Sequence, residues 1–244
     1  MSRRDPLTGP GPVGFRPTAW SLILSARTLS PQRRSRALGQ LISVYWLPVY
    51  WTFRTDWNAG PEEARDLTQE YFAVFLEKKL LDQVAREKGR FRSYVRATLK
   101  NFMLMRKRAR KTAKRGGRVH IGPLDDLAGV EAQAVRSGES PERRFDRDLM
   151  RSVFQESMKK VEQDCALAGN SAHFDLFRAY YILEDAAGAG YESLQERFGL
   201  GAHDVKNRLS SMRKRFRETV LGFLRDGTSS EEELVAEIQE LFET

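Results

Sequence analysis

The chain of 244 residues contains one cysteine, Cys165, and three histidines. A single cysteine cannot form an internal disulfide, so a secreted scaffold held together by disulfides is excluded. The histidines, His120, His173 and His203, do not show the spacing of metal ligands. We therefore expect neither a metal nor another cofactor.

Long apolar runs are also missing. No stretch approaches the ~20 apolar residues that a membrane-spanning helix needs, so no membrane contact is expected. Residues 1–17 are rich in proline and glycine, have no apolar segment typical of a secretory signal, and are expected to be disordered. Together with the lone cysteine, this indicates a cytoplasmic protein. Strand-like alternation is not convincing anywhere, so an all-α fold is predicted.

Acidic residues are absent from one long segment. The chain has 41 Lys and Arg against 33 Asp and Glu, a net charge of +8. Twelve basic residues and no acidic one lie between Arg90 and Arg118, and subtracting these twelve charges from +8 leaves −4 for the rest. Positive charge gathered in one segment is typical of a surface that binds a polyanion.

Apolar residues at helical spacing predict two groups of helices on either side of a glycine-containing stretch. The predicted helices cover 18–24, 31–53, 61–79, 91–114, 141–167, 171–185, 190–198, 202–225 and 231–243. The stretch between the groups is interpreted as a flexible linker between two small domains. The predicted division is a lead (1–17), a first domain (18–115), the linker (116–140), a second domain (141–225) and an acidic C-terminal helix (226–244).

Residues 190–217 show the pattern of a helix-turn-helix. A short helix ends at Phe198, the turn Gly199-Leu200-Gly201 follows, and a longer helix begins at Ala202. The outer face of the longer helix is basic, with Lys206, Arg208, Arg213, Lys214, Arg215 and Arg217. In such a unit the second helix fits the major groove of DNA. The alternative is an ordinary helical hairpin with a solvated basic face.

The helix predicted over 91–114 combines an aromatic stripe with dense positive charge. Such density suits the neutralisation of DNA phosphates, and a merely solvated helix face usually alternates the signs of its charges. The rings of Phe91, Tyr94 and Phe102 are able to stack on unpaired bases. The alternative is that these rings belong to the core.

Asp66, Gln69 and Glu70 lie side by side on the helix predicted over 61–79 because they are three and four residues apart. Paired carboxylates suit acid–base catalysis. However, no nucleophile motif, metal-ligand set or phosphate-binding loop accompanies them, and we expect no enzymatic activity. A face that docks another protein is the better interpretation, with plain solvation as the alternative.

These three segments follow one another in the order found in bacterial sigma factors, and the chain resembles the extracytoplasmic-function class of the sigma-70 family. The residues that carry the resemblance are Glu62 to Phe72, similar to an Asp-Leu-x-Gln-Glu-x-Phe signature; Phe91 to Arg110, similar to the promoter-melting helix; Val205 to Leu209, similar to a Val-Lys-x-Arg-Leu core; and Thr18 to Leu22, similar to the opening of one subgroup. Asp204 departs from the threonine of many relatives, which puts the promoter sequence in doubt.

The resemblance implies a subunit that binds core RNA polymerase, recognises promoter DNA and promotes strand opening. Asp66, Gln69 and Glu70 would bind polymerase, and a loop at 82–90 would accept a flipped base. The residues expected at the minus-10 element are Arg90, Arg92, Arg96, Lys100, Asn101, Arg106 and Lys107. Those expected at the minus-35 element are His203, Lys206, Asn207, Arg208 and Arg213.

The main alternative is a stand-alone helix-turn-helix regulator that never contacts polymerase. An anti-sigma factor or a regulatory kinase is a candidate partner in control of the protein. The C-terminal segment from Asp226 to Thr244 has seven acidic residues and no basic one. We hypothesise that this helix lies against the basic second domain and restrains it; a helix that only improves solubility is the alternative.

Overall fold

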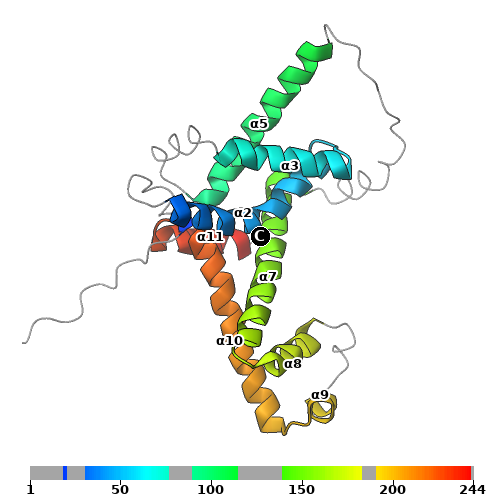
Figure 1. Cartoon of the computed structure of the whole chain (residues 1–244), viewed down its shortest axis with the longest axis vertical. Helices are drawn as coiled ribbons and strands as arrows, with labels where there is room; N and C mark the ends of the chain where they lie inside the picture. The colour runs from blue at the N-terminus through cyan, green and yellow to red at the C-terminus, as the bar shows by residue number, and fades with distance from the viewer. Residues whose placement is uncertain (1–18, 21–30, 77–89, 115–138, 183–190, 243–244) are drawn as a thin grey trace, which may run out of the picture.

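The computed structural model describes residues 19–20, 31–76, 90–114, 139–182 and 191–242 (Figure 1). Within these ranges the regular elements are helices and no strand occurs, so the prediction of an all-α fold is confirmed. None of the described helices is both long enough and apolar enough to cross a membrane.

The helices agree closely with the sequence prediction. They are α2 (Pro31–Thr55), α3 (Pro61–Leu76), α5 (Phe91–Lys114), α7 (Pro141–Leu167), α8 (Ser171–Tyr181), α9 (Tyr191–Phe198), α10 (Ala202–Asp226) and α11 (Glu231–Phe242). Ala19 and Trp20 are helical as well. The predicted lead (1–17), the predicted loop up to residue 89 and most of the predicted linker (116–138) lie outside the described residues.

Local signals in the sequence set the starts of two helices. Ser140 caps α7: its Oγ accepts a hydrogen bond from the amide of Arg143 at 3.2 Å, and Pro141 occupies the first helical position. Ser230 caps α11 in the same way, accepting from the amide of Glu233 at 3.2 Å. The Glu233 carboxylate accepts from the amide of Ser229 at 2.7 Å, which completes a capping box shifted by one residue.

One continuous core joins helices from both sides of the predicted linker. The start of α7 packs against α2, and the end of α10 and all of α11 join the same core. Its buried members include Trp20, Tyr45, Phe53, Phe75, Phe91, Phe145, Leu149, Leu224 and Leu234. In this structure the two predicted domains therefore share their largest core.

Two long helices connect this shared core with the far end of the molecule. Helices α7 and α10, of 27 and 25 residues, run side by side away from α2 and α11 toward α8 and α9 (Figure 1). Two smaller apolar clusters lie along them, one around Cys165 and Met212 and one around Leu194 and Leu209. The arrangement holds α9 and the start of α10 far from α5.

Candidate nucleic-acid interface

A glycine turn sets the angle between α9 and α10. Gly199 has φ +62°, a left-handed conformation that glycine adopts without strain. The amide of Leu200 donates to the carbonyl of Gln195 at 3.0 Å, the closing bond of a Schellman motif. One apolar cluster next to the turn contains the buried residues Leu194, Val205, Leu209 and Leu176. This packing fixes α10 by one face and leaves the other open.

Most of the residues expected at the minus-35 element lie on the open face of α10. His203, Lys206, Asn207 and Arg213 are exposed, and Arg208 is half-buried. The guanidinium of Arg213 lies 5.8 Å from the centre of the Tyr181 ring. The structure therefore brings most of the predicted minus-35 residues together on the outer side of the first turns of α10.

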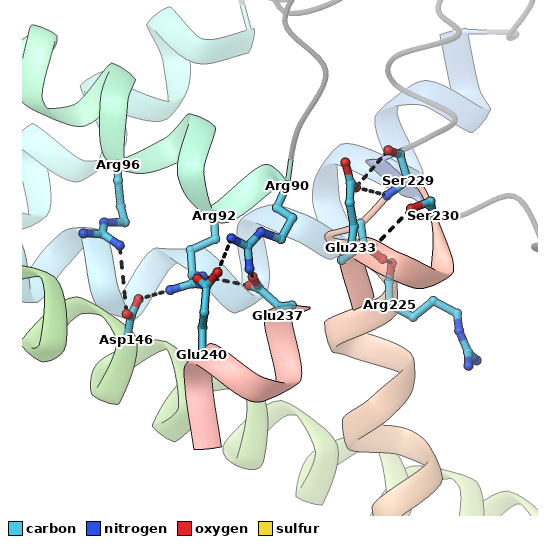
Figure 2. Close-up of polar contacts among 11 residues, drawn as sticks. Arg90, Arg92, Arg96, Asp146, Arg225, Ser229, Ser230, Glu233, Glu237 and Glu240 are labelled. Carbon is cyan, nitrogen blue, oxygen red and sulfur yellow. Dashed lines mark hydrogen bonds and ion pairs between the residues drawn. The ribbon is translucent and has the colours of Figure 1, made fainter. Parts of the chain in front are cut away.

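The residues expected at the minus-10 element fall into two groups along α5. At its start, Arg90, Arg92 and Arg96 face α7 and α11 rather than solvent (Figure 2). Further along, Lys100, Asn101 and Lys107 are exposed. The single predicted surface is thus covered at one end and open at the other.

Arg92 is the most enclosed of these side chains, with only 2% of its surface exposed. Its Nη1 lies 2.8 Å from Oδ1 of Asp146 on α7, and its Nε donates to Oε1 of Glu237 on α11 at 2.9 Å. Its Nη2 pairs with Glu240. Burial lowers the pKa of Arg92, but Glu237 and Asp146 outweigh burial and raise the pKa above its ordinary value. Arg92 is consequently a charged group inside the protein.

Arg90 and Arg96 extend the same cluster. Arg90 donates to Glu237 at 3.0 Å and to Glu240 at 2.6 Å. This hydrogen bond from Arg90 is the main reason why the pKa of Glu240 is lowered. Arg96 lies more loosely, 3.9 Å from carboxylate oxygens of both Glu142 and Asp146. Carboxylates from two other helices therefore neutralise the start of α5.

The cluster changes one part of the expectation for the acidic tail. As expected, α11 lies against helices of the predicted second domain, α10 and α7. However, its carboxylates Glu237 and Glu240 pair with the start of α5, in the predicted first domain. A signal for this contact is present in the sequence. Leu234 and Leu241 mark the buried face of α11, and Glu237 lies between them at helical spacing, so an acidic residue occupies a core position.

The aromatic rings of α5 belong to the core, which was the alternative to stacking on bases. Phe91 and Phe102 are buried, and the Phe91 ring lies 4.9 Å from that of Trp20. The prediction that the rings of Phe91 and Phe102 stack on bases is therefore wrong for this structure. Tyr94 is half-buried and packs between Trp20 and Phe75. The aromatic stripe of the sequence holds α5 in place instead of presenting rings to a ligand.

A groove follows α5 on the side of its exposed cations. It has a volume of about 530 Å³ and lies between the end of α2, α5 and the start of α7. Apolar side chains, among them Trp57 and Met103, line it together with Lys100 and Lys107, and with the acidic residues Asp56 and Glu142 at its α2 and α7 sides. An apolar surface bordered by cations suits an unpaired base and its phosphate.

The polar face of α3 is open in part. Asp66 and Gln69 are exposed, while Leu67 and Thr68 on the other side of the helix are buried. Glu70 is half-buried and forms an ion pair with Arg106 of α5. The structure thus links one residue of the predicted polymerase set with one residue of the predicted minus-10 set.

In the described ranges the protein is all-helical and presents three polar surfaces, on α3, along α5 and at the start of α10. Within those ranges, no group of three or more His, Cys, Asp or Glu side chains is placed to hold a metal ion. In comparisons with family models, curated proteins and solved structures, nothing matches this chain.

Proposed function

We propose that the chain is a promoter-recognition subunit of bacterial RNA polymerase, of the sigma-factor type. The observation that carries the proposal is the start of α10. Its buried residues Val205 and Leu209 fix the helix behind a glycine turn, and its exposed residues Lys206 and Asn207 point away from the protein. A helix held in this manner fits the major groove of B-form DNA.

The side chains of the first turns of α10 have a chemistry suited to DNA. Lys206 and Arg208 provide positive charge for phosphates, which supplies affinity without sequence preference. Asn207 is able to bind adenine through its amide, and Asp204 is able to accept from the amino group of cytosine. No bond is made or broken, so this function needs no catalytic residue.

The open part of α5 is proposed to hold the separated DNA strand. Lys100 and Lys107 are exposed beside the groove, and Asn101 is exposed on the same helix. Unstacking a base costs a few kcal/mol, which contacts to the base and to the phosphates must offset. A groove with an apolar lining and basic side chains provides both kinds of contact.

Docking on polymerase is assigned to the exposed face of α3. Asp66 and Gln69 point to solvent from a helix that is fixed by buried Leu67 and Tyr71. A stand-alone regulator has no use for a polymerase-docking face, so binding to polymerase through this face is what distinguishes the proposal from its main alternative. The charge of Asp66 suits a basic partner surface.

The test is a pull-down of the full chain with bacterial core RNA polymerase. We expect stoichiometric binding by the wild type and clearly weaker binding by Asp66→Ala. Glu162→Ala, which removes an exposed carboxylate from α7, is the matched control and should bind like the wild type. If the wild type binds DNA and not polymerase, the chain is a stand-alone regulator. Equal binding by both variants would refute the role of Asp66.

A further inference from the structure

Helix α11 covers the start of α5 with charge. Glu237 and Glu240 both contact Arg90 and Arg92, and Figure 2 shows both carboxylates close to the two arginine side chains. Arginine binds carboxylate and phosphate through the same paired geometry. A DNA phosphate at this place would therefore need the positions that the α11 carboxylates occupy.

Apolar contacts and a backbone bond hold α11 there. Leu234 and Leu241 are buried in the shared core. The amide of Phe91, the first residue of α5, donates to the carbonyl of Gly227 at 2.8 Å in the turn before α11. Helix α11 is thus connected to the end of α10 and held against the first turn of α5.

The cover is also limited in extent. Beyond Arg96, the predicted minus-10 residues Lys100 and Lys107 are exposed. Half of Glu240 remains exposed, so this side of the ion-pair cluster is open to water and to competing anions. The contact between α11 and α5 is buried at Glu237 and open at Glu240. A competing anion can therefore begin to displace α11 at Glu240.

We propose that α11 is an intramolecular inhibitor that competes with DNA for Arg90 and Arg92. The proposal rests on the proposed function, since it assumes that α5 binds DNA. In the closed state described above, α5 offers DNA only its distal cations. When α11 leaves, Arg90 loses both of its described carboxylate partners, and Arg92 keeps only its contact with Asp146 on α7. The part of the DNA affinity that depends on the start of α5 then scales with the fraction of open molecules.

The experiment measures DNA binding of the full chain after weakening α11 in two independent ways. Every chain also carries Lys206→Ala and Arg208→Ala, so that binding by α10 does not hide the change at α5. Glu240→Gln removes a charge from the cluster, and Glu232→Gln, an exposed residue of the same helix, is its control. Leu241→Ala removes a buried anchor without changing charge, and Val235→Ala, at an exposed position, is its control.

The probe is a fluorescein-labelled single-stranded DNA of mixed sequence, and the readout is anisotropy over a series of salt concentrations. We expect Glu240→Gln to tighten binding about threefold, as for the loss of an exposed ion pair. We expect Leu241→Ala to tighten it about tenfold, because it raises the fraction of open molecules. Both should steepen the salt dependence, by about 0.7 in the logarithmic slope for each additional phosphate contact. Circular dichroism checks that each variant keeps its helices.

The outcomes separate this proposal from the proposed function. Binding by the parent chain with no gain in Glu240→Gln or Leu241→Ala overturns the inhibition and leaves DNA binding by α5 intact. Equal gains in Glu232→Gln and Glu240→Gln show only a general effect of charge and also overturn it. If none of these chains binds DNA, and the wild-type protein with intact Lys206 and Arg208 does not bind DNA either, the proposed function fails and the inhibition fails with it.

Discussion

The buried pair of Arg92 and Glu237 gives the sharpest prediction for stability. Both side chains are almost fully enclosed, with 2% and 4% of their surfaces exposed. Removing one member of a buried ion pair leaves the other charge without adequate compensation and typically costs about 3–5 kcal/mol. We expect Arg92→Met to cost about 3 kcal/mol, the lower end of that range, because Arg90 still contacts Glu237.

The double variant Arg92→Met, Glu237→Leu should recover most of this loss. Two apolar side chains of similar volume would fill the site, and such replacements are often neutral or stabilising. The charges that remain keep partners, since Arg90 pairs with Glu240 and Arg96 lies near Asp146. We expect the double variant to unfold within about 1 kcal/mol of the wild type.

The assay is urea unfolding followed by circular dichroism. With a slope of about 2–3 kcal/mol per molar urea, Arg92→Met should lower the midpoint by about 1 M. Lys159→Met is the control, because Lys159 forms an exposed ion pair with Glu156 at 2.7 Å and should cost no more than about 1 kcal/mol. Equal midpoints for Arg92→Met and Lys159→Met would refute the argument from burial.

Three further predictions concern other parts of the molecule. Gly199→Ala should destabilise the chain by about 1–2 kcal/mol in urea unfolding through backbone strain at φ +62°. Crowding does not contribute, because no atom beyond the two adjoining residues lies within 4 Å of the added methyl group; an unchanged midpoint would contradict this. Lys206→Ala and Arg208→Ala should each weaken duplex DNA binding and lower the salt slope by about 0.9, whereas Lys159→Ala should not. Asp148→Asn should stabilise the protein at neutral pH, because burial raises the pKa of Asp148 and its ionised form therefore destabilises the folded state. That gain should shrink as the pH falls through the raised pKa, where the native carboxyl becomes neutral, and urea unfolding at several pH values measures it; a gain independent of pH would refute the assignment.

The helices were predictable because their signals are local. The bounds of 91–114 and 141–167 agree with α5 and α7. Ser140 and Pro141 mark the start of α7 within a few residues of sequence, and the hydrogen bond of the cap confirms the reason. The same holds for Val205 and Leu209, whose helical spacing identified the buried face of α10.

The environment of Arg92 was not predictable by the same means. An arginine within a basic helix is expected to face solvent or phosphate, and its own neighbours in sequence contain no acidic residue. Its enclosure depends on Glu237, which is 145 residues away in the chain. Which apolar faces meet is likewise a non-local property, so the contact between α2 and α7 could not be read from the spacing within either helix.

The length of α10 has a mechanical consequence. Its first turns form the outer end of the molecule, and its last turn reaches the core beneath α11, so one uninterrupted rod of about 37 Å connects them. The orientation of the outer face relative to the core is therefore set by helical phase. Each residue inserted between Met212 and Val220 would rotate one end about 100° against the other, and two full turns, about seven residues, would nearly restore the alignment.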